Sequence, residues 1–127
     1  MTTTNVRVAL MTACASLVIA ARPAVAVAQD PAVVNAETVK VKLENDRVRV
    51  LEAVLEPGQK EKPHAHPGYV TYVMTTGKMR MHAADGTTRD VELTAGQTLF
   101  TEPLTHWAEN IGTTTMRFVL VELKKSN

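Results

Sequence analysis

The sequence contains a single cysteine, Cys14, and no cysteine follows it. The chain therefore cannot form an internal disulfide bond, and a catalytic cysteine is excluded from everything after residue 14. Aromatic residues are also scarce, because Trp, Tyr and Phe together make up 4% of the chain. Aliphatic side chains and methionine must therefore fill most of the core. Stability has to come from packing and not from covalent cross-links.

The chain also lacks an excess of charge of either sign, since its 14 Lys and Arg residues stand against 13 Asp and Glu residues. When residues 1–28, which hold two arginines and no acid, are set aside, 12 basic and 13 acidic residues remain among 99. Neither half has a basic stripe, so this balance excludes a nucleic-acid-binding surface. About a hundred residues are enough for one small domain and too few for two separate cores.

Residues 1–28 have the three parts of a secretory signal peptide. Arg7 provides the positive start, and residues 8–21 form an apolar run of fourteen residues. This run is too short to cross about 30 Å of hydrocarbon. Small residues allow cleavage after Ala28 or, as the second choice, after Ala26, while a buried hydrophobic helix is the competing interpretation. The sequence thus predicts a secreted protein of a bacterial periplasm, without a membrane span in the mature chain.

The mature chain has a sequence period of two, which is typical of half-buried strands. Residues 29–38 form an N-terminal tether, residues 39–123 the domain, and residues 124–127 a tail. Turn signals at Pro57-Gly58 and Asp85-Gly86 separate the alternating segments. The expected strands cover residues 39–44, 47–55, 69–76, 78–82, 89–93, 98–101 and 116–123. About eight short strands without a convincing helix predict an all-β fold with a single small, jelly-roll-like β-barrel.

Histidines are the candidates for site chemistry. His64 and His66 are one residue apart in a segment that Pro63 and Pro67 keep extended. Because residues i and i+2 of a strand point to the same face, both imidazoles project into one space. Two such nitrogens can bind one transition-metal ion at about 2.0–2.1 Å. The competing interpretation is a pair of surface histidines beside prolines. His82 precedes a hairpin turn and is expected to be exposed.

Two motifs resemble those of the cupin family, whose members are small β-barrels with metal sites. The first family motif is a glycine, His-x-His, a glutamate and a second glycine, and all but the glutamate stand at family spacing in Gly58, His64, His66 and Gly77. The second motif ends in a histidine and an asparagine, which His106 and Asn110 match. The resemblance covers residues 39–123. It implies a cupin barrel in which His64, His66 and His106 bind a divalent transition metal ion.

The chain departs from the family at the glutamate position, where it has Val70, followed by Thr71. Counting alternate residues puts Val70 and Tyr72 on the inner face with the histidine pair. Pro103 also stands where the second motif has a glycine. Since valine cannot bind a metal, the resemblance implies three neutral imidazoles and an open coordination position. Imidazole suits several ions, so Fe(II) or Zn is expected, with Mn, Ni and Cu as alternatives.

Two residues are the candidate catalytic groups. Glu102, four residues before His106, is the expected replacement carboxylate, acting as a general base or as a hydrogen-bond partner of a ligand histidine. Its competing interpretation is a solvated loop charge. Tyr72 is expected to face the pocket and to orient a ligand through its hydroxyl group.

The resemblance leaves three functions open. The first is metal-dependent, dioxygenase-like chemistry on a small organic molecule, which makes the protein an oxidoreductase. The second is non-catalytic binding of a metal or a small molecule in the periplasm, and the third is a structural role without metal. Small cupins commonly form dimers, so a homodimer is also expected, with the exposed first strand at residues 38–44 in its support.

Overall fold

The structure of the protein is a computed structural model that describes residues 29–125. The predicted signal peptide, residues 1–28, lies outside the described residues. Within residues 29–125, no helix has the length and apolar character needed to cross a membrane. The elements, in chain order, are α1 (Pro31–Val34), β1 (Val39–Glu44), β2 (Val48–Leu55), β3 (His64–His66), β4 (Tyr69–Val73), β5 (Gly77–Ala83), β6 (Thr88–Leu93), β7 (Thr98–Thr101), β8 (Leu104–Asn110) and β9 (Met116–Leu123).

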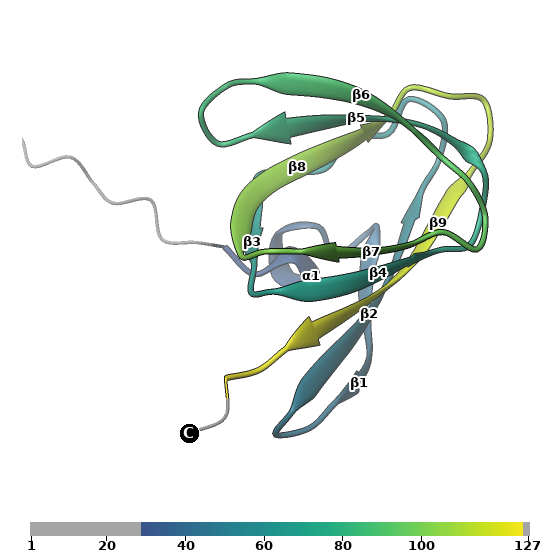
Figure 1. Cartoon of the computed structure of the whole chain (residues 1–127). Coiled ribbons are helices and arrows are strands. Elements are labelled where there is room, and N and C mark those ends of the chain that lie inside the picture. The colour runs from purple at the N-terminus through teal and green to yellow at the C-terminus, as the bar shows by residue number, and fades with distance from the viewer. Residues whose placement is uncertain (1–28, 126–127) are drawn as a thin grey trace, which may run out of the picture.

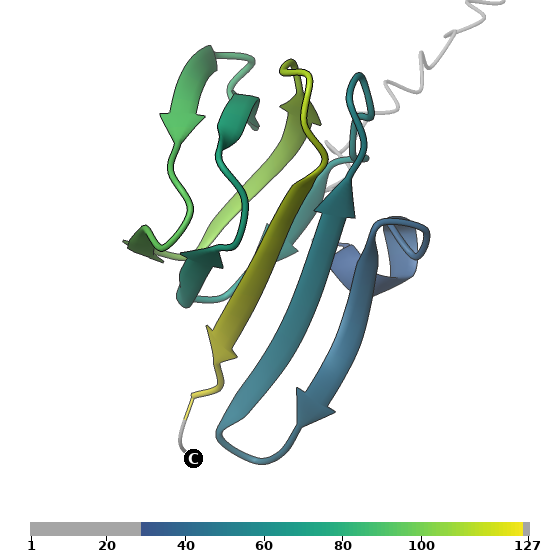
Figure 2. The same cartoon turned by 90° about the vertical axis from the view of Figure 1, so that its right-hand side faces the viewer.

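The strands form two antiparallel sheets that face each other (Figure 1). The first sheet has the strand order β1-β2-β9-β4-β7, and the second has the order β3-β8-β5-β6. Seen from the side, β2 and β9 cross one wall of the barrel, while the β5–β6 hairpin lies across from them (Figure 2). The prediction of an all-β barrel is confirmed.

The core consists of apolar side chains that point inward from both sheets. Leu51 and Leu55 of β2, Val73 of β4, Met79 of β5 and Met116 of β9 are each at most 1% exposed. Burying one such side chain contributes about 1.5–3 kcal/mol to folding. Leu51, Leu55 and Met79 also line the cavity described below, so the core and the site share one wall.

The chain crosses from one sheet to the other at Pro67 and Gly68. Strand β3 belongs to the second sheet and β4 to the first, so the alternation of β3 does not continue into β4. In β4, Tyr69 and Val73 are buried, whereas Tyr72 is 48% exposed. The prediction that Val70 and Tyr72 share the inner face with the histidine pair is therefore wrong.

Two elements were not expected from the sequence. Strand β8 was missed because its inward positions include His106 and Asn110, and polar residues at such positions hide the alternation. The segment 29–38 contains the helix α1, although the sequence suggested only a tether. Asp30 caps this helix by accepting a hydrogen bond from the Ala32 backbone N–H at 2.8 Å, and Pro31 occupies its first turn.

Two residues of the histidine motifs have structural roles. A Cβ atom on Gly77 would overlap the sulfur of buried Met116 and lie 2.8 Å from the Thr114 hydroxyl, so any other residue there would force these side chains to move. Asn110 is fully buried. Its amide nitrogen donates to the carbonyl oxygens of Leu55 at 2.9 Å and Thr114 at 2.8 Å. These bonds fasten the end of β8, and so the strand that carries His106.

Candidate metal centre

The three histidines predicted as metal ligands lie together on the inner wall of the barrel. His64 and His66 belong to β3, and the antiparallel register pairs His64 directly with His106 of β8. All three are buried, and one ring nitrogen from each lies within 4.8 Å of the other two. The ring centroids are separated by 4.8, 4.9 and 5.3 Å. Small side-chain movements would bring three such nitrogens to about 2.0–2.1 Å from a shared ion.

The neighbours of each ring bear on which of its nitrogens is available to a metal ion. The Nδ1 atom of His66 lies 2.6 Å from the Glu122 carboxylate, and the Nδ1 atom of His64 lies 2.8 Å from the carbonyl oxygen of Lys62. The Glu122 carboxylate is an acceptor, so Nδ1 of His66 carries the proton and its Nε2 keeps the lone pair. The Nδ1 atom of His64 lies between this carbonyl acceptor and the amide nitrogen of Asn35, a donor at 2.9 Å, so either tautomer of His64 finds a partner there. The Nε2 atom of His106 is buried and has no hydrogen-bond partner within residues 29–125. An unpaired buried nitrogen of this kind is what a metal ligand requires before the ion binds.

The surroundings of His64 and His106 favour neutral imidazole, the form that binds a metal. Burial lowers the pKa of His64 below its ordinary value. Burial lowers the pKa of His106 to about 3, and repulsion from His64 and His66 adds to this effect. His106 is therefore uncharged throughout the physiological pH range.

Glu122 of β9 anchors the ring of His66. One oxygen of this buried carboxylate accepts a hydrogen bond from His66 Nδ1, and the other accepts a hydrogen bond from Arg49 Nε at 2.6 Å. Arg49 also pairs with Asp30 at 2.5 Å. Burial by itself raises the pKa of Glu122, but the hydrogen bonds from His66 and Arg49 outweigh it and hold the pKa below its ordinary value. Glu122 is thus ionised, its negative charge is paired with Arg49, and it orients the candidate metal ligand His66.

Glu61 is a second buried carboxylate, and it stands three residues before His64. Its backbone N–H donates to the Ala108 carbonyl at 2.9 Å, and its Oε2 accepts from the Ala108 N–H at 3.1 Å. The same oxygen lies 4.0 Å from His64 Nε2. Burial raises the pKa of Glu61 to about 7, against the opposing effect of the Ala108 N–H. Within residues 29–125, Glu61 has no ion pair with a lysine or an arginine.

The N-terminal segment supports the histidine strand. The Asn35 side chain holds the Lys62 backbone with both of its polar atoms, at 2.7 and 3.1 Å, and its Nδ2 atom lies 2.9 Å from His64 Nδ1. The Ala65 N–H donates to the Gln29 carbonyl at 2.9 Å. The segment that the sequence suggested to be a tether is therefore part of the wall behind the histidines.

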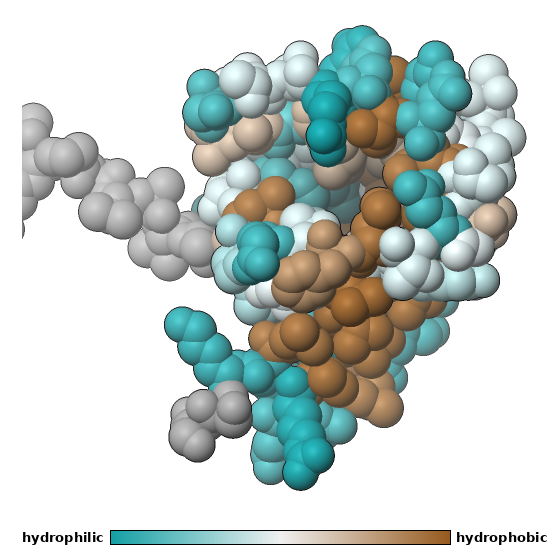
Figure 3. Space-filling model, in the orientation of Figure 1, coloured by the Kyte–Doolittle hydropathy of each residue, from teal (hydrophilic) through white to brown (hydrophobic). Residues whose placement is uncertain are grey.

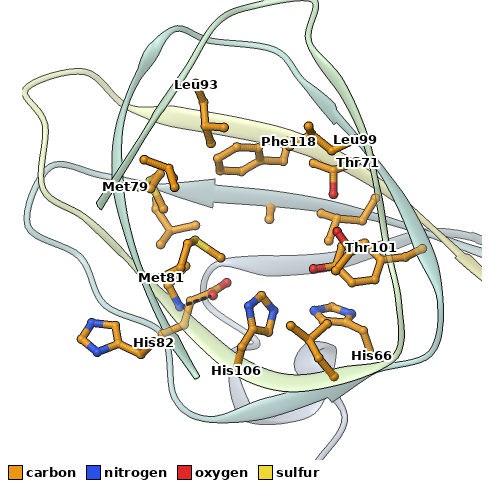
Figure 4. Close-up of a pocket in the computed structure, with 18 of the residues that line it drawn as sticks. His66, Thr71, Met79, Met81, His82, Leu93, Leu99, Thr101, His106 and Phe118 are labelled. Atoms are coloured by element: carbon orange, nitrogen blue, oxygen red, sulfur yellow. Dashed lines mark hydrogen bonds between the residues drawn. The ribbon is translucent and has the colours of Figure 1, made fainter. Parts of the chain in front are cut away.

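The histidines line a cavity of about 660 Å³ inside the barrel. His66 and His106 project into it from one side, across from Met79, Leu93 and Phe118 (Figure 4). Its mouth is the hollow below the β5–β6 hairpin in the surface view (Figure 3). A volume of this size suits a small organic molecule.

Neither predicted catalytic residue lies in this cavity. Glu102 is an exposed residue between β7 and β8, and the half-exposed Tyr72 is on the outer face of β4. The placement predicted for Tyr72 is wrong because the parity count ran across the sheet crossing. Thr71, and not Val70, is the β4 residue that lines the cavity at this level, so this strand still supplies no carboxylate.

His82 stands at the rim of the cavity and is separate from the cluster. Its ring points away from the cavity in Figure 4 and stacks on Trp107, with centroids 5.1 Å apart and an angle of 9° between the rings. Its Nε2 lies 3.4 Å from the Glu109 carboxylate. It is only partly exposed, and it does not join the three-histidine cluster.

Glu61, Glu122 and Arg49 were missed in the sequence, and only one of them left a readable signal. Glu122 follows Phe118 and Leu120 at the same parity of a strongly apolar strand, so an inward charge could have been expected there. Glu61 lies outside the regular strands, where no period indicates its direction.

Comparison with known proteins agrees with this architecture. The family model described as a cupin domain matches residues 51–122. A cupin domain from Bordetella pertussis is 31% identical, with a TM-score of 0.64 over 68% of this chain and 92% of that chain. A conserved protein with a double-stranded β-helix domain from Klebsiella pneumoniae is 28% identical, with a TM-score of 0.53 over 68% and 83% of the two chains. A predicted oxalate decarboxylase from Thermotoga maritima is 24% identical, with a TM-score of 0.52 over 68% and 79%. Comparison with curated proteins found no match.

The fold and the site define a small single-barrel protein with a buried cluster of three histidines. The family match and the Bordetella relative show that the chain belongs to the cupin family. The resemblance inferred from the two histidine motifs is confirmed.

The raised pKa of Glu61 predicts a pH-dependent effect of replacing it with glutamine. The folded protein holds the Glu61 proton up to a pKa of about 7, whereas the ordinary value is 4.5, so the metal-free wild type loses stability as the pH rises between these values. Glu61→Gln removes this loss. We expect urea unfolding to give similar free energies near pH 4.5 and an advantage for the variant at pH 8 of up to about 3 kcal/mol. An advantage that does not change with pH, or one that Glu102→Gln reproduces, would contradict the assignment.

Proposed function

We propose that this protein is an exported cupin that binds a divalent transition metal through His64, His66 and His106 and acts on a small organic molecule by oxygenase-like chemistry. The observation that carries the proposal is the buried Nε2 of His106, which has no partner within residues 29–125, beside the ring of His66, whose proton is held on Nδ1 by Glu122, and the ring of His64. Export is supported by the charge and apolar pattern of residues 1–28.

The donor set narrows the metal to ions that imidazole binds well. Three neutral nitrogens without a carboxylate from β4 suit Fe(II) or Zn first, with Mn, Ni and Cu as alternatives. A redox-active ion such as iron would supply the chemistry for dioxygen when bound.

The protein's own residues would orient the reactants and exclude water. Glu122 holds the ring of His66, and the Lys62 carbonyl and the Asn35 amide together position the ring of His64, so two of the three ligands are oriented before any ion binds. The apolar wall formed by Met79, Leu93 and Phe118 would bind the hydrophobic part of a substrate.

The alternative is a non-catalytic cupin that holds a metal or a small molecule in the periplasm. It is favoured by the absence of the family glutamate, since Val70 stands at that position of the motif and Thr71 is the residue after it that lines the cavity. This alternative requires the same histidine cluster, so only turnover separates the two functions.

We also propose that two copies of the chain pair through the outer face of the first sheet. Outward residues of adjacent strands are apolar in register, with Val70 beside Val121 and Val121 beside Val50. Tyr72 and Phe100 are 48% and 59% exposed on the same face. Brown residues gather over β4, β9 and β2 in the surface view (Figure 3). An apolar face of this extent commonly marks a protein–protein contact.

Metal analysis tests the histidine site. The wild-type protein is expected to bind close to one equivalent of metal, and His64→Ala and His106→Ala less than about a tenth of that, because each ligand is indispensable in a three-nitrogen shell. The melting temperature of the wild type should be about 10 °C or more lower after chelation than in a free metal concentration of 100 times the Kd.

His82→Ala is the matched control, because it removes a histidine outside the cluster. It should leave the metal content and the effect of chelation on the melting temperature unchanged. Equal traces of metal in wild type and all variants, with a melt unaffected by chelation, would refute the site. Protein recovered from the periplasm should begin at Gln29 on amino-terminal sequencing, which tests export in the same preparation.

Oxygen uptake distinguishes the oxygenase from the binding protein. Iron-loaded protein is to be mixed with a panel of phenols, thiols and 1,3-diketones in an oxygen electrode. An oxygenase should consume oxygen with at least one class of compound, and His106→Ala should abolish the uptake. Tightly bound iron without uptake across the whole panel would instead support the binding protein.

Sedimentation tests the assembly. Wild-type protein should sediment as a dimer at micromolar concentration, and Tyr72→Lys as a monomer, because a buried unpaired ammonium group strongly opposes association. Ala84→Lys, at an exposed turn position outside this face, is the control and should remain dimeric. A monomeric wild type would contradict the pairing.

A further inference from the structure

Among the described residues that line the cavity, one buried carboxyl group has no use in the proposed function. Glu61 is 9% exposed, lines the cavity, and lies beside His64 with 4.0 Å between its Oε2 and the ring Nε2. Burying a carboxylate without a cation is costly, and such groups are retained mainly where they serve a site.

The position of this carboxylate is fixed by β8. Two hydrogen bonds join Glu61 to Ala108, one through its backbone N–H and one through its side chain. Ala108 is two residues from His106 on the same inward face of β8. The Glu61 carboxylate is thereby held in the histidine wall, next to the place where the three rings converge.

The negative charge of Glu61 is not needed for this attachment. A glutamine at position 61 could accept the same Ala108 hydrogen bond through its amide oxygen, at a smaller cost of desolvation. Glu122 offers the contrast, because its charge is neutralised by Arg49 and used to hold His66. Glu61 has no comparable partner within residues 29–125, so its charge is left to act on whatever enters the cavity.

We propose that Glu61 makes the cavity select molecules that present a hydrogen-bond donor, such as a phenol, an enol or an amine, over carboxylates of the same size. This inference rests on the proposed function, and it names the substrate class of the same cavity. An ionised carboxylate accepts hydrogen bonds and repels anions.

The rest of the wall is consistent with such a ligand. Arg89 is the one lysine or arginine among the described residues that line the cavity, and it is exposed on β6. No buried lysine or arginine is therefore available in the described wall to neutralise an anionic ligand, and in the metal-free protein the described wall offers no other fixed cation. The opposite wall is apolar at Met79, Leu93 and Phe118, which suits the hydrocarbon part of a phenol or enol.

The experiment compares phenol with benzoate, two probes that share a ring and differ in the charge of the polar group. Calorimetric titrations use wild type, Glu61→Gln and Glu102→Gln at pH 8, above the pKa of about 7 of Glu61. Each protein is titrated both metal-free and loaded with Zn(II), which does not turn over oxygen. Glu102→Gln removes the same charge from an exposed loop.

We expect Glu61→Gln to shift the ratio of the Kd values for benzoate and phenol by about tenfold or more in favour of benzoate, through weaker phenol and tighter benzoate binding. Glu102→Gln should leave the ratio within about twofold of the wild type. A ratio that does not change in Glu61→Gln overturns the inference, even where the histidine site binds zinc as proposed.

Zinc affinity separates this inference from the alternatives. Glu61→Gln should bind Zn(II) within about fivefold of the wild type, because a residue that selects ligands is not itself a metal ligand. A loss of about a hundredfold, comparable to that of His64→Ala, would make Glu61 a metal ligand and overturn its role in selection. A wild type that binds no zinc would refute the proposed function, while the metal-free titrations would still decide the role of Glu61.

Discussion

The pairing of β3 with β8 is the constraint on which the site depends. It puts His64 directly opposite His106 and turns His66 to the same inner face, although His66 and His106 are 40 residues apart along the chain. A shift of the register by one residue would turn the histidine side chains of one of the two strands to the outer surface. Asn110 holds the far end of β8, and the Gln29 carbonyl holds the middle of β3, so both strands are fixed at points outside the cluster.

The two buried carboxylates around the cluster illustrate two uses of the same chemical group. Glu122 is neutralised by Arg49 and His66, and its charge serves to hold one ring in place. Glu61 receives one backbone hydrogen bond on its carboxylate and no cation within residues 29–125, so its pKa rises to about 7. Burial alone would raise the pKa of both groups. The opposite outcomes therefore follow from the partners, which decide whether a buried acid orients a ligand or remains available to the cavity.

The barrel could be predicted from the sequence because most strands bury apolar residues at alternate positions. The histidine cluster was also predictable, since extended His-x-His fixes two rings and the second motif supplies the third. The inner face of β4 was not, because Pro67 and Gly68 carry the chain into the other sheet and the parity count begins again at Tyr69. Strand β8 was missed because the polar residues that serve the site, His106 and Asn110, face inward and break the apolar alternation. Glu61 lies in an irregular segment, where its direction depends on a contact with Ala108 that no local pattern encodes.

The N-terminal segment connects the predicted export of this chain to its site. Cleavage after Ala28 would leave Gln29 as the first residue, and the Gln29 carbonyl already accepts a hydrogen bond from Ala65, between the two histidines of β3. Asp30 is paired with Arg49, which in turn holds Glu122 and through it His66. A cut two residues earlier, after Ala26, would preserve all of these contacts, whereas a cut only two residues later would remove both Gln29 and Asp30. If residues 1–28 are removed as the sequence predicts, every one of these contacts is kept, whereas a cut further along would remove contacts that support the histidine wall.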